Sequence, residues 1–236
     1  MEMGMTWLAL IAPIVIVVCY VILLCFYLRM EARHDFLRAT TLKLTLGALF
    51  CIMGVACVLT LMLAGMLEVP DILVLCGLIC AIGGDYFLQF IRLDAKKFNI
   101  GIFFFALTQC FLIASLLLRF GLGWQEFVIT VVVLLLVLLL MKKQDWQLGR
   151  ARLPLTVYTV LLVFMASKAV AGMFSMEALP VRSAVMASGA VLFLVSDLFL
   201  GIWNYHSDKW IHAKLNWITY FAGMILIALS LHPVTV

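Results

Sequence analysis

Two aspartates, Asp85 and Asp197, stand in long apolar stretches with similar local sequences. Residues 83–88 read Gly-Gly-Asp-Tyr-Phe-Leu and residues 195–200 read Val-Ser-Asp-Leu-Phe-Leu. A carboxylate inside a membrane span costs about 2.5–3.5 kcal/mol even on the most lenient insertion scale. If the two side chains approach one another, one keeps its proton, because two carboxylates at low dielectric cannot both ionise cheaply. The pair therefore predicts a general acid beside a general base.

The composition identifies the surroundings of these acids as a lipid bilayer. The chain has 236 residues, of which 67% are hydrophobic and 12% are charged, and its mean hydropathy is +1.21. Soluble domains are about 45–50% apolar and about 25% charged. A polytopic membrane protein is therefore expected, and the net charge of +4 gives no reason to expect a nucleic-acid partner.

Apolar runs long enough to cross about 30 Å of hydrocarbon recur along the whole chain. Helices are the expected form, because open sheet edges cannot satisfy their backbone groups in lipid. The sequence predicts an all-α bundle, with residues 1–236 forming a single transmembrane domain. The expected spans are Trp7–Leu28, Thr41–Leu63, Asp71–Ile91, Ile100–Leu118, Glu126–Met141, Pro154–Phe174, Arg182–Trp203 and His212–Leu231.

Basic residues predict the orientation of these eight spans, because cytoplasmic loops carry an excess of Lys and Arg. The breaks after the second, fourth and sixth spans hold only Arg119 and Arg182. Both termini are therefore expected on the non-cytoplasmic side. The breaks after the odd-numbered spans hold Arg29, Arg33, Arg38, Arg92, Lys96, Lys97, Lys142, Lys143, Arg150, Arg152 and Lys209.

In this orientation Asp85 and Asp197 lie at similar depth in the cytoplasmic half, and other polar residues gather at that level. They predict a cavity that opens toward the cytoplasmic leaflet. Both aspartates stand in a short Asp-x-Phe-Leu or Asp-Leu-Phe-Leu sequence before a basic loop, which suggests a four-plus-four internal repeat. The expected substrate-binding residues are Lys43, Tyr158, Asn216, Tyr220, Arg92 and Gln89.

Simpler interpretations remain open for several of these residues. Asp85 and Lys43 could form a structural ion pair, and Lys43 could instead extend to the interface, as long basic side chains do. Lys168 lies in the outer half, away from the acids, and is expected to serve helix packing or to extend in the same way. The outer half offers few polar groups beyond Gln109, Ser115 and Lys168 itself, which counts against a transport path across the membrane. No serine has a histidine at its depth, and no histidine–cysteine spacing indicates a metal, so neither a metal nor another cofactor is expected.

The motifs around the aspartates resemble the YhhN family of eight-span lysoplasmalogenases. The resemblance lies in Gly-Asp-x-Phe-Leu at 84–88, Gly-x-Val-Leu-Phe-x-Val-Ser-Asp-x-x-Leu at 189–200, and Thr-Tyr at 219–220 followed by Leu-Ile-Ala-Leu-Ser at 226–230. Lys43, and Tyr158 with Met165, also fit. The family pattern differs at two places: a histidine is common near Gln109, and a glutamine stands where this chain has Gly223.

The resemblance implies hydrolysis of the vinyl-ether bond of a lysoplasmalogen to a fatty aldehyde and glycerophosphoethanolamine or glycerophosphocholine. Asp85 and Asp197 would then be the catalytic pair, and the partner would be a lysophospholipid drawn from the bilayer. Tyr158, Tyr220 and Asn216 would position water or the glycerol hydroxyl, and Lys43 with Arg92 would contact the phosphate.

Two other functions fit the same residues. A proton-coupled transporter would use the carboxylates as a relay, and a non-catalytic lipid-binding protein would use them to hold helices together. The short loops favour a bacterial inner membrane, with the endoplasmic reticulum as the alternative. Head-group preference and oligomeric state are not determined by these patterns.

Overall fold

The computed structural model describes residues 2–90, 95–146, 152–175 and 180–233. These residues form eight α-helices and no strand, and every helix is long and apolar enough to cross a membrane. The all-helical, multi-pass architecture is therefore confirmed. The helices are α1 (Glu2–Ala32), α2 (Phe36–Leu63), α3 (Val69–Leu88), α4 (Ala95–Phe120), α5 (Gln125–Lys143), α6 (Arg152–Ser175), α7 (Pro180–Tyr205) and α8 (Trp210–Leu229).

The helices match the expected spans, with one shift that affects the site. Helix α3 ends at Leu88, whereas the sequence prediction continued it to Ile91. The backbone N–H of Phe90 bonds the carbonyl of Phe87 at 3.1 Å, so the chain turns there. Asp85 therefore lies within one turn of the end of α3, and Gln89 caps the helix instead of extending its face.

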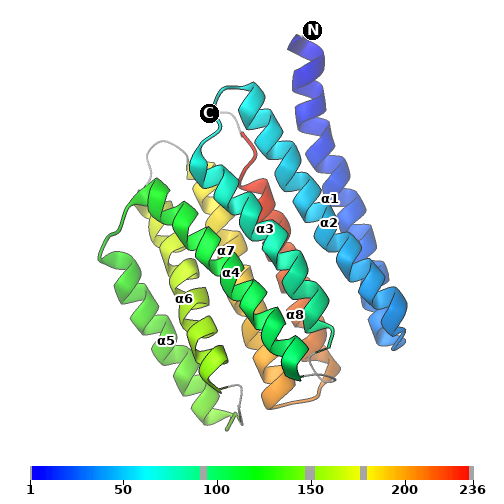
Figure 1. Ribbon diagram of the computed structural model, residues 1–236, viewed down its shortest axis with the longest axis vertical. Helices are drawn as coiled ribbons and strands as arrows, with labels where there is room; N and C mark the ends of the chain where they lie inside the picture. Colours follow the sequence, from blue (N-terminus) through cyan, green and yellow to red (C-terminus); the bar gives the residue numbers. More distant parts are fainter. Residues whose placement is uncertain (1, 91–94, 147–151, 176–179, 234–236) are drawn as a thin grey trace.

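The bundle consists of two similar groups of four helices (Figure 1). Helix α3 packs along α4 and α7 packs along α8, while α1 covers α2 and α5 covers α6 at the two sides. Contacts between α2 and α8 and between α4 and α6 join the groups. This arrangement of neighbours is the one that a four-plus-four duplication predicts, although the duplication itself stays a prediction.

Both ends of the described chain lie at one end of the bundle (Figure 1). We call this the outer end, and we call the opposite end, which holds the turns after α1, α3, α5 and α7, the inner end. The assignment of the inner end to the cytoplasm rests on the basic loops and stays a prediction.

Glycines allow the helices that carry the two aspartates to approach their partners closely. A Cβ atom on Gly84 would lie 2.6 Å from the ring of Phe105 on α4. A Cβ atom on Gly189 or on Gly223 would lie 2.9 Å from the carbonyl oxygen of the other residue. Small residues at such contacts are typical of helix packing in membranes, and here they fix α3 against α4 and α7 against α8.

Candidate active site

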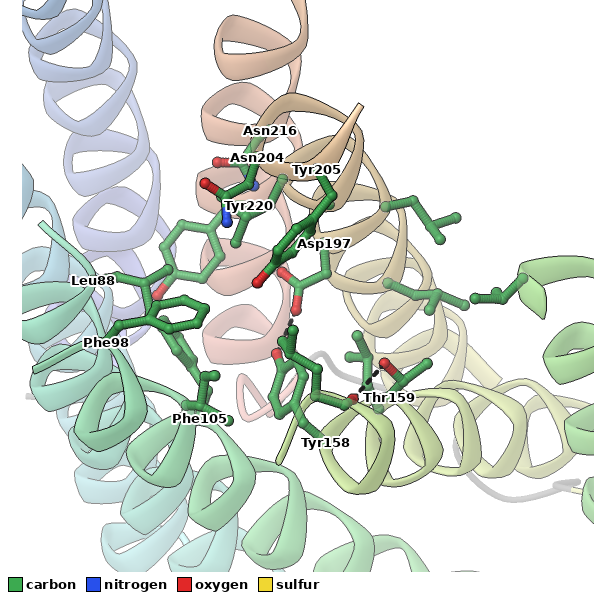
Figure 2. Close-up of a pocket in the computed structure, with 18 of the residues that line it drawn as sticks. Leu88, Phe98, Phe105, Tyr158, Thr159, Asp197, Asn204, Tyr205, Asn216 and Tyr220 are labelled. Atoms are coloured by element: carbon green, nitrogen blue, oxygen red, sulfur yellow. Dashed lines mark hydrogen bonds between the residues drawn. The ribbon is translucent and has the colours of Figure 1, made fainter. Parts of the chain in front are cut away.

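A cavity of about 110 Å³ lies between α3, α4, α5, α6, α7 and α8, and both aspartates line it. Figure 2 shows Asp197, Tyr158, Tyr220 and Asn216 around this space, with the ring of Phe105 on the α4 side. Lys43 also lines it. The structure thus brings together residues from five helices, α2, α3, α6, α7 and α8, that sequence reasoning had placed at one depth.

The carboxylate of Asp85 is fully buried and is held by two partners. The hydroxyl of Tyr220 on α8 donates to Oδ2 at 2.7 Å, and Nζ of Lys43 on α2 lies 3.5 Å from Oδ1. Lys43 is itself buried, so the hypothesis that it extends to the interface is wrong. The expected ion pair is present and joins α2 to α3. The hydrogen bond from Tyr220 joins α8 to them.

The carboxylate of Asp197 is partly exposed, and hydroxyl groups contact it on both oxygens. The hydroxyl of Tyr158 on α6 donates to Oδ2 in a short hydrogen bond (Figure 2). Oγ of Ser196 lies 3.2 Å from Oδ1 and donates its hydrogen to the carbonyl of Phe193 at 2.7 Å. Within the described ranges, no lysine or arginine forms an ion pair with Asp197. The two acids therefore have different electrostatic surroundings.

The remaining predicted binding residues have different positions. The side-chain amide of Asn216 donates to the carbonyl of Ser196 at 2.8 Å, which fixes α8 against α7 beside Asp197. Gln89 donates to Oγ1 of Thr40 at 3.2 Å and does not line the cavity, because α3 ends before it. Arg92 lies outside the described residues.

Sequence reasoning missed several residues that line the cavity, including Phe105, Thr159, Asn204 and Trp217. Asn204 follows Asp197 by seven residues, which places both on one face of α7, and this spacing was the signal available for it. The Phe105 ring meets Tyr220 edge-on at 5.8 Å between centroids. No local sequence signal identifies that contact, since it depends on how α4 packs.

Comparison with known proteins agrees with the motifs. A family model described as the YhhN family matches residues 48–231, which include both aspartates, Tyr158, Asn216 and Tyr220. The chain belongs to the YhhN family. This is the family of the lysoplasmalogenases. No curated protein matches the chain, and no solved structure matches it.

The structure explains one of the two positions at which the chain departs from the YhhN pattern. Gly223 lies at the close contact with Gly189, so a larger side chain there would require α7 and α8 to move apart. Gln109 on α4 is fully buried near the Tyr158 hydroxyl, and its amide atoms meet no hydrogen-bond partner in the described part of the chain. A buried amide without a partner is costly, and the packing around Gln109 does not explain its presence.

The outer half contains a second set of buried charges, and the expectation of few polar groups there is wrong. Oδ1 of Asp71 lies 2.5 Å from Nη2 of Arg119 and 2.6 Å from Nη2 of Arg182. Lys168 is buried and lies 2.9 Å from Oε1 of Glu126. Lys168 thus serves helix packing, as one interpretation predicted, and does not extend to the interface.

No metal cluster emerges from the described ranges: no group of three or more His, Cys, Asp or Glu side chains is placed to hold an ion.

Proposed function

We propose that this YhhN protein is a membrane lysoplasmalogenase that hydrolyses the vinyl-ether bond of a single-chain glycerophospholipid by acid and base catalysis at Asp197 and Asp85. One observation carries the proposal. Two carboxylates line the same cavity, one paired with a cation and the other contacted, within the described residues, by neutral hydroxyl groups. Such a difference in environment is how proteins assign acid and base roles to two carboxyl groups.

Asp197 is assigned as the general acid. A carboxyl group in an apolar cavity without a neighbouring cation favours its neutral form. Its Oδ2 already accepts the Tyr158 hydroxyl, so the proton belongs on Oδ1. Oγ of Ser196, which donates to the carbonyl of Phe193 at 2.7 Å, lies 3.2 Å from that Oδ1. Asp197 is also the more exposed of the two acids toward the cavity, where a substrate would lie.

Asp85 is assigned as the general base. The ammonium group of Lys43 at 3.5 Å and the Tyr220 hydroxyl at 2.7 Å both favour its ionised form. This contact favours Lys43 as a counter-charge for the carboxylate over a direct phosphate contact. Tyr220 additionally fixes the orientation of the carboxylate, because a hydrogen bond to a charged acceptor is short and directional.

Vinyl ethers are stable to nucleophiles and bases, but they react with acid. One protonated and one ionised carboxyl group can donate and accept every proton that the reaction transfers. Asp197 protonates the alkenyl carbon distal to the ether oxygen, which gives an oxocarbenium ion. Water adds to that ion while Asp85 takes its proton, and a hemiacetal forms. The hemiacetal collapses when Asp85 returns the proton to the glycerol oxygen and Asp197 removes the hydroxyl proton. The products are an aldehyde and an alcohol, and both carboxyl groups regain their starting states.

The expected substrate is amphiphilic, as the cavity is. The acids, Lys43 and Asn216 contribute polar groups to its lining, and aliphatic side chains of α5, α6 and α7 contribute apolar surface. A lysoplasmalogen, with ethanolamine or choline as its head group, has its vinyl ether between the polar and apolar parts. Such a substrate would come from the bilayer, for which a bacterial inner membrane is the proposed location.

The test is release of fatty aldehyde from lysoplasmenylethanolamine and lysoplasmenylcholine by detergent-purified protein. We expect release by the wild type and a loss of about 10³-fold in Asp197→Asn and in Asp85→Asn, the range of general acid–base contributions. Asp35→Asn is the matched control, since Asp35 caps α2 at the inner end away from the cavity. Size-exclusion chromatography checks that each variant is folded. Absence of aldehyde from folded wild type on both substrates would refute the proposal.

The rival functions predict different outcomes. A proton-coupled transporter needs polar groups that continue from the acids toward the outer end, and the outer charges instead pair with one another and do not line the cavity. A lipid-binding protein would bind the substrate and release no aldehyde. In that case Asp197→Asn would change binding or stability alone.

A further inference from the structure

Aliphatic side chains of α5, α6 and α7 line part of the cavity beside the two acids, and we call this part the arm. Each helix contributes two of these side chains, spaced by one helical turn on α5 and α7 and by two turns on α6. Tyr158 and Asp197 lie between the aliphatic positions of α6 and α7, so the arm adjoins the polar groups of the site. The side chains that line the arm are Val137, Met141, Leu155, Leu162, Leu194 and Leu198.

Helix α5 is held at its two ends and forms the outermost wall of this arm. Toward the outer end it is tied to α6 by the Glu126–Lys168 pair at 2.9 Å. At the inner end Trp146, just after α5, stacks on Tyr205 of α7 with 6.1 Å between ring centroids and packs against Gly201. Between its ends α5 packs mainly on α6. In Figure 1 it lies at the side of the bundle.

The two faces of α5 differ in what they contact. Val137 is 5% exposed and faces the cavity, as does Met141. Leu139, on the opposite face, is 62% exposed, and Leu136 is 60% exposed. In a multi-pass membrane protein this exposed face contacts lipid. A single helix therefore separates the aliphatic arm from the bilayer.

We propose that the hydrocarbon chain of a single-chain lipid enters sideways from the bilayer beside α5 and lies in the arm between α5, α6 and α7, with its ether end at Asp85 and Asp197. This inference rests on the proposed function and names the path and the contact residues of its substrate. Val137 and Met141 are then residues that determine which chains reach the acids.

The size of the cavity supports entry from the side over complete enclosure. Pockets that enclose a drug-sized ligand measure about 300–1,000 Å³, whereas this cavity measures about 110 Å³. It therefore accepts the first part of a long chain, and the rest remains between the lipid tails. Leaving that part in the bilayer costs little, because lipid tails are as apolar as the leucines that line the arm.

Bulky substitutions in the arm test the path against an exposed control on the same helix. Val137→Trp and Met141→Trp fill the arm, while Leu139→Trp adds the same side chain on the lipid face two residues away. The substrates are vinyl-ether glycerophosphoethanolamines with a long chain of about 16 carbons and a short chain of about 4 carbons. We expect kcat/KM for the long chain to fall about tenfold or more in Val137→Trp, since a filled core site excludes added atoms.

The short substrate and the control decide how that loss is interpreted. Short-chain turnover is expected to stay within about twofold in Val137→Trp, and both substrates within about twofold in Leu139→Trp, the usual size of exposed substitutions. An equal loss on both chain lengths, or the same loss in Leu139→Trp, would overturn the proposed path.

A second measurement does not depend on turnover. A lysophosphatidylethanolamine with a diazirine at the middle of its chain is photolysed with the wild type and with Val137→Trp, and the labelled peptides are sequenced by mass spectrometry. We expect labels in residues 133–141 and 194–201 of the wild type and their loss in Val137→Trp. Labels confined to α1 and α2 would refute the path even if aldehyde is released. Labels in the arm without aldehyde would retain the lipid path and refute the proposed reaction instead.

Discussion

The inner and the outer halves of the bundle bury their acidic side chains in opposite ways. In the outer half, Asp71 accepts from two guanidinium groups and from the backbone N–H of Glu68, and Glu126 accepts from Lys168 and from the backbone N–H of Gly123. In the inner half, Asp85 has one cation at 3.5 Å, and the hydroxyl groups of Tyr158 and Ser196 contact Asp197.

Burial alone therefore does not identify a functional acid in a membrane. Asp71 and Glu126 are at least as buried as Asp85, but each pairs with a cation at 2.9 Å or less and neither lines the cavity of the acid pair. The inner acids line that cavity, and hydroxyl groups with at most one lysine hold each of them. Buried charges that are fully paired serve structure, whereas incompletely paired acids beside a cavity are available for proton transfer.

The strongest test of this comparison removes the shared outer acid. Asp71→Asn leaves Arg119 and Arg182 buried without a carboxylate, and we expect a loss of about 3–5 kcal/mol in unfolding free energy. Thermal unfolding in detergent, followed by circular dichroism, measures it. Aldehyde release per folded molecule should stay near that of the wild type. A large loss of activity in protein that remains stable would contradict the structural role of this cluster.

The second outer pair offers a double-variant test. Lys168→Met leaves Glu126 buried without its cation, and we expect a loss of about 3 kcal/mol. Adding Glu126→Gln to Lys168→Met removes the uncompensated charge and should recover stability to within about 1 kcal/mol of the wild type, since apolar or neutral replacements of buried ion pairs are often tolerated. Equal melting temperatures for Lys168→Met and the double variant would show that Glu126 is not left as a costly unpaired charge when Lys168 is removed.

Lys43, in the inner half, should behave in the reverse way to Lys168: its removal should lower activity more than stability. In Lys43→Met, Asp85 loses its counter-charge and takes up a proton instead of remaining as a buried charge. We expect aldehyde release to fall about 10²-fold, because the base is lost, with a smaller change in melting temperature than in Lys168→Met. A variant that unfolds but keeps its activity per folded molecule would make Lys43–Asp85 a structural pair like those of the outer half.

The smallest effects are expected from removing tyrosine hydroxyls. These variants compare hydroxyls that donate to a carboxylate with a hydroxyl that donates to a backbone carbonyl. Tyr158→Phe and Tyr220→Phe each remove one hydrogen bond to a catalytic acid, and aldehyde release should fall about tenfold. Tyr20→Phe is the control, since its hydroxyl donates to the carbonyl of Phe221 at 2.9 Å. It should cost about 1 kcal/mol of stability and leave kcat unchanged. A tenfold loss of aldehyde release in Tyr20→Phe would mean that removing any buried tyrosine hydroxyl disturbs the site, whether or not that hydroxyl contacts a carboxylate.

Much of the inner site could be predicted from the sequence, because polarity is rare in a membrane span. Asp85, Asp197, Lys43, Tyr158, Asn216 and Tyr220 stand out against apolar neighbours, and all of them line the cavity. Gln89 was assigned to the site by helical spacing, which fails because α3 ends at Leu88. Phe105 and Trp217 could not be found in this way, since aromatic residues are common in every span and only packing selects those that face the cavity.

The sequence determines that the chain forms helices long and apolar enough to span a membrane, since only helices satisfy the backbone within lipid. It also places both acids in the inner-end halves of their helices, since helical rise is constant. Tertiary structure alone decided which charges became partners. Asp71 meets Arg182 across 111 positions of the chain, and Lys43 meets Asp85, because the rotation and neighbours of each helix depend on close contacts such as Gly84 with Phe105. Those contacts made one set of buried acids structural and left the other facing a cavity.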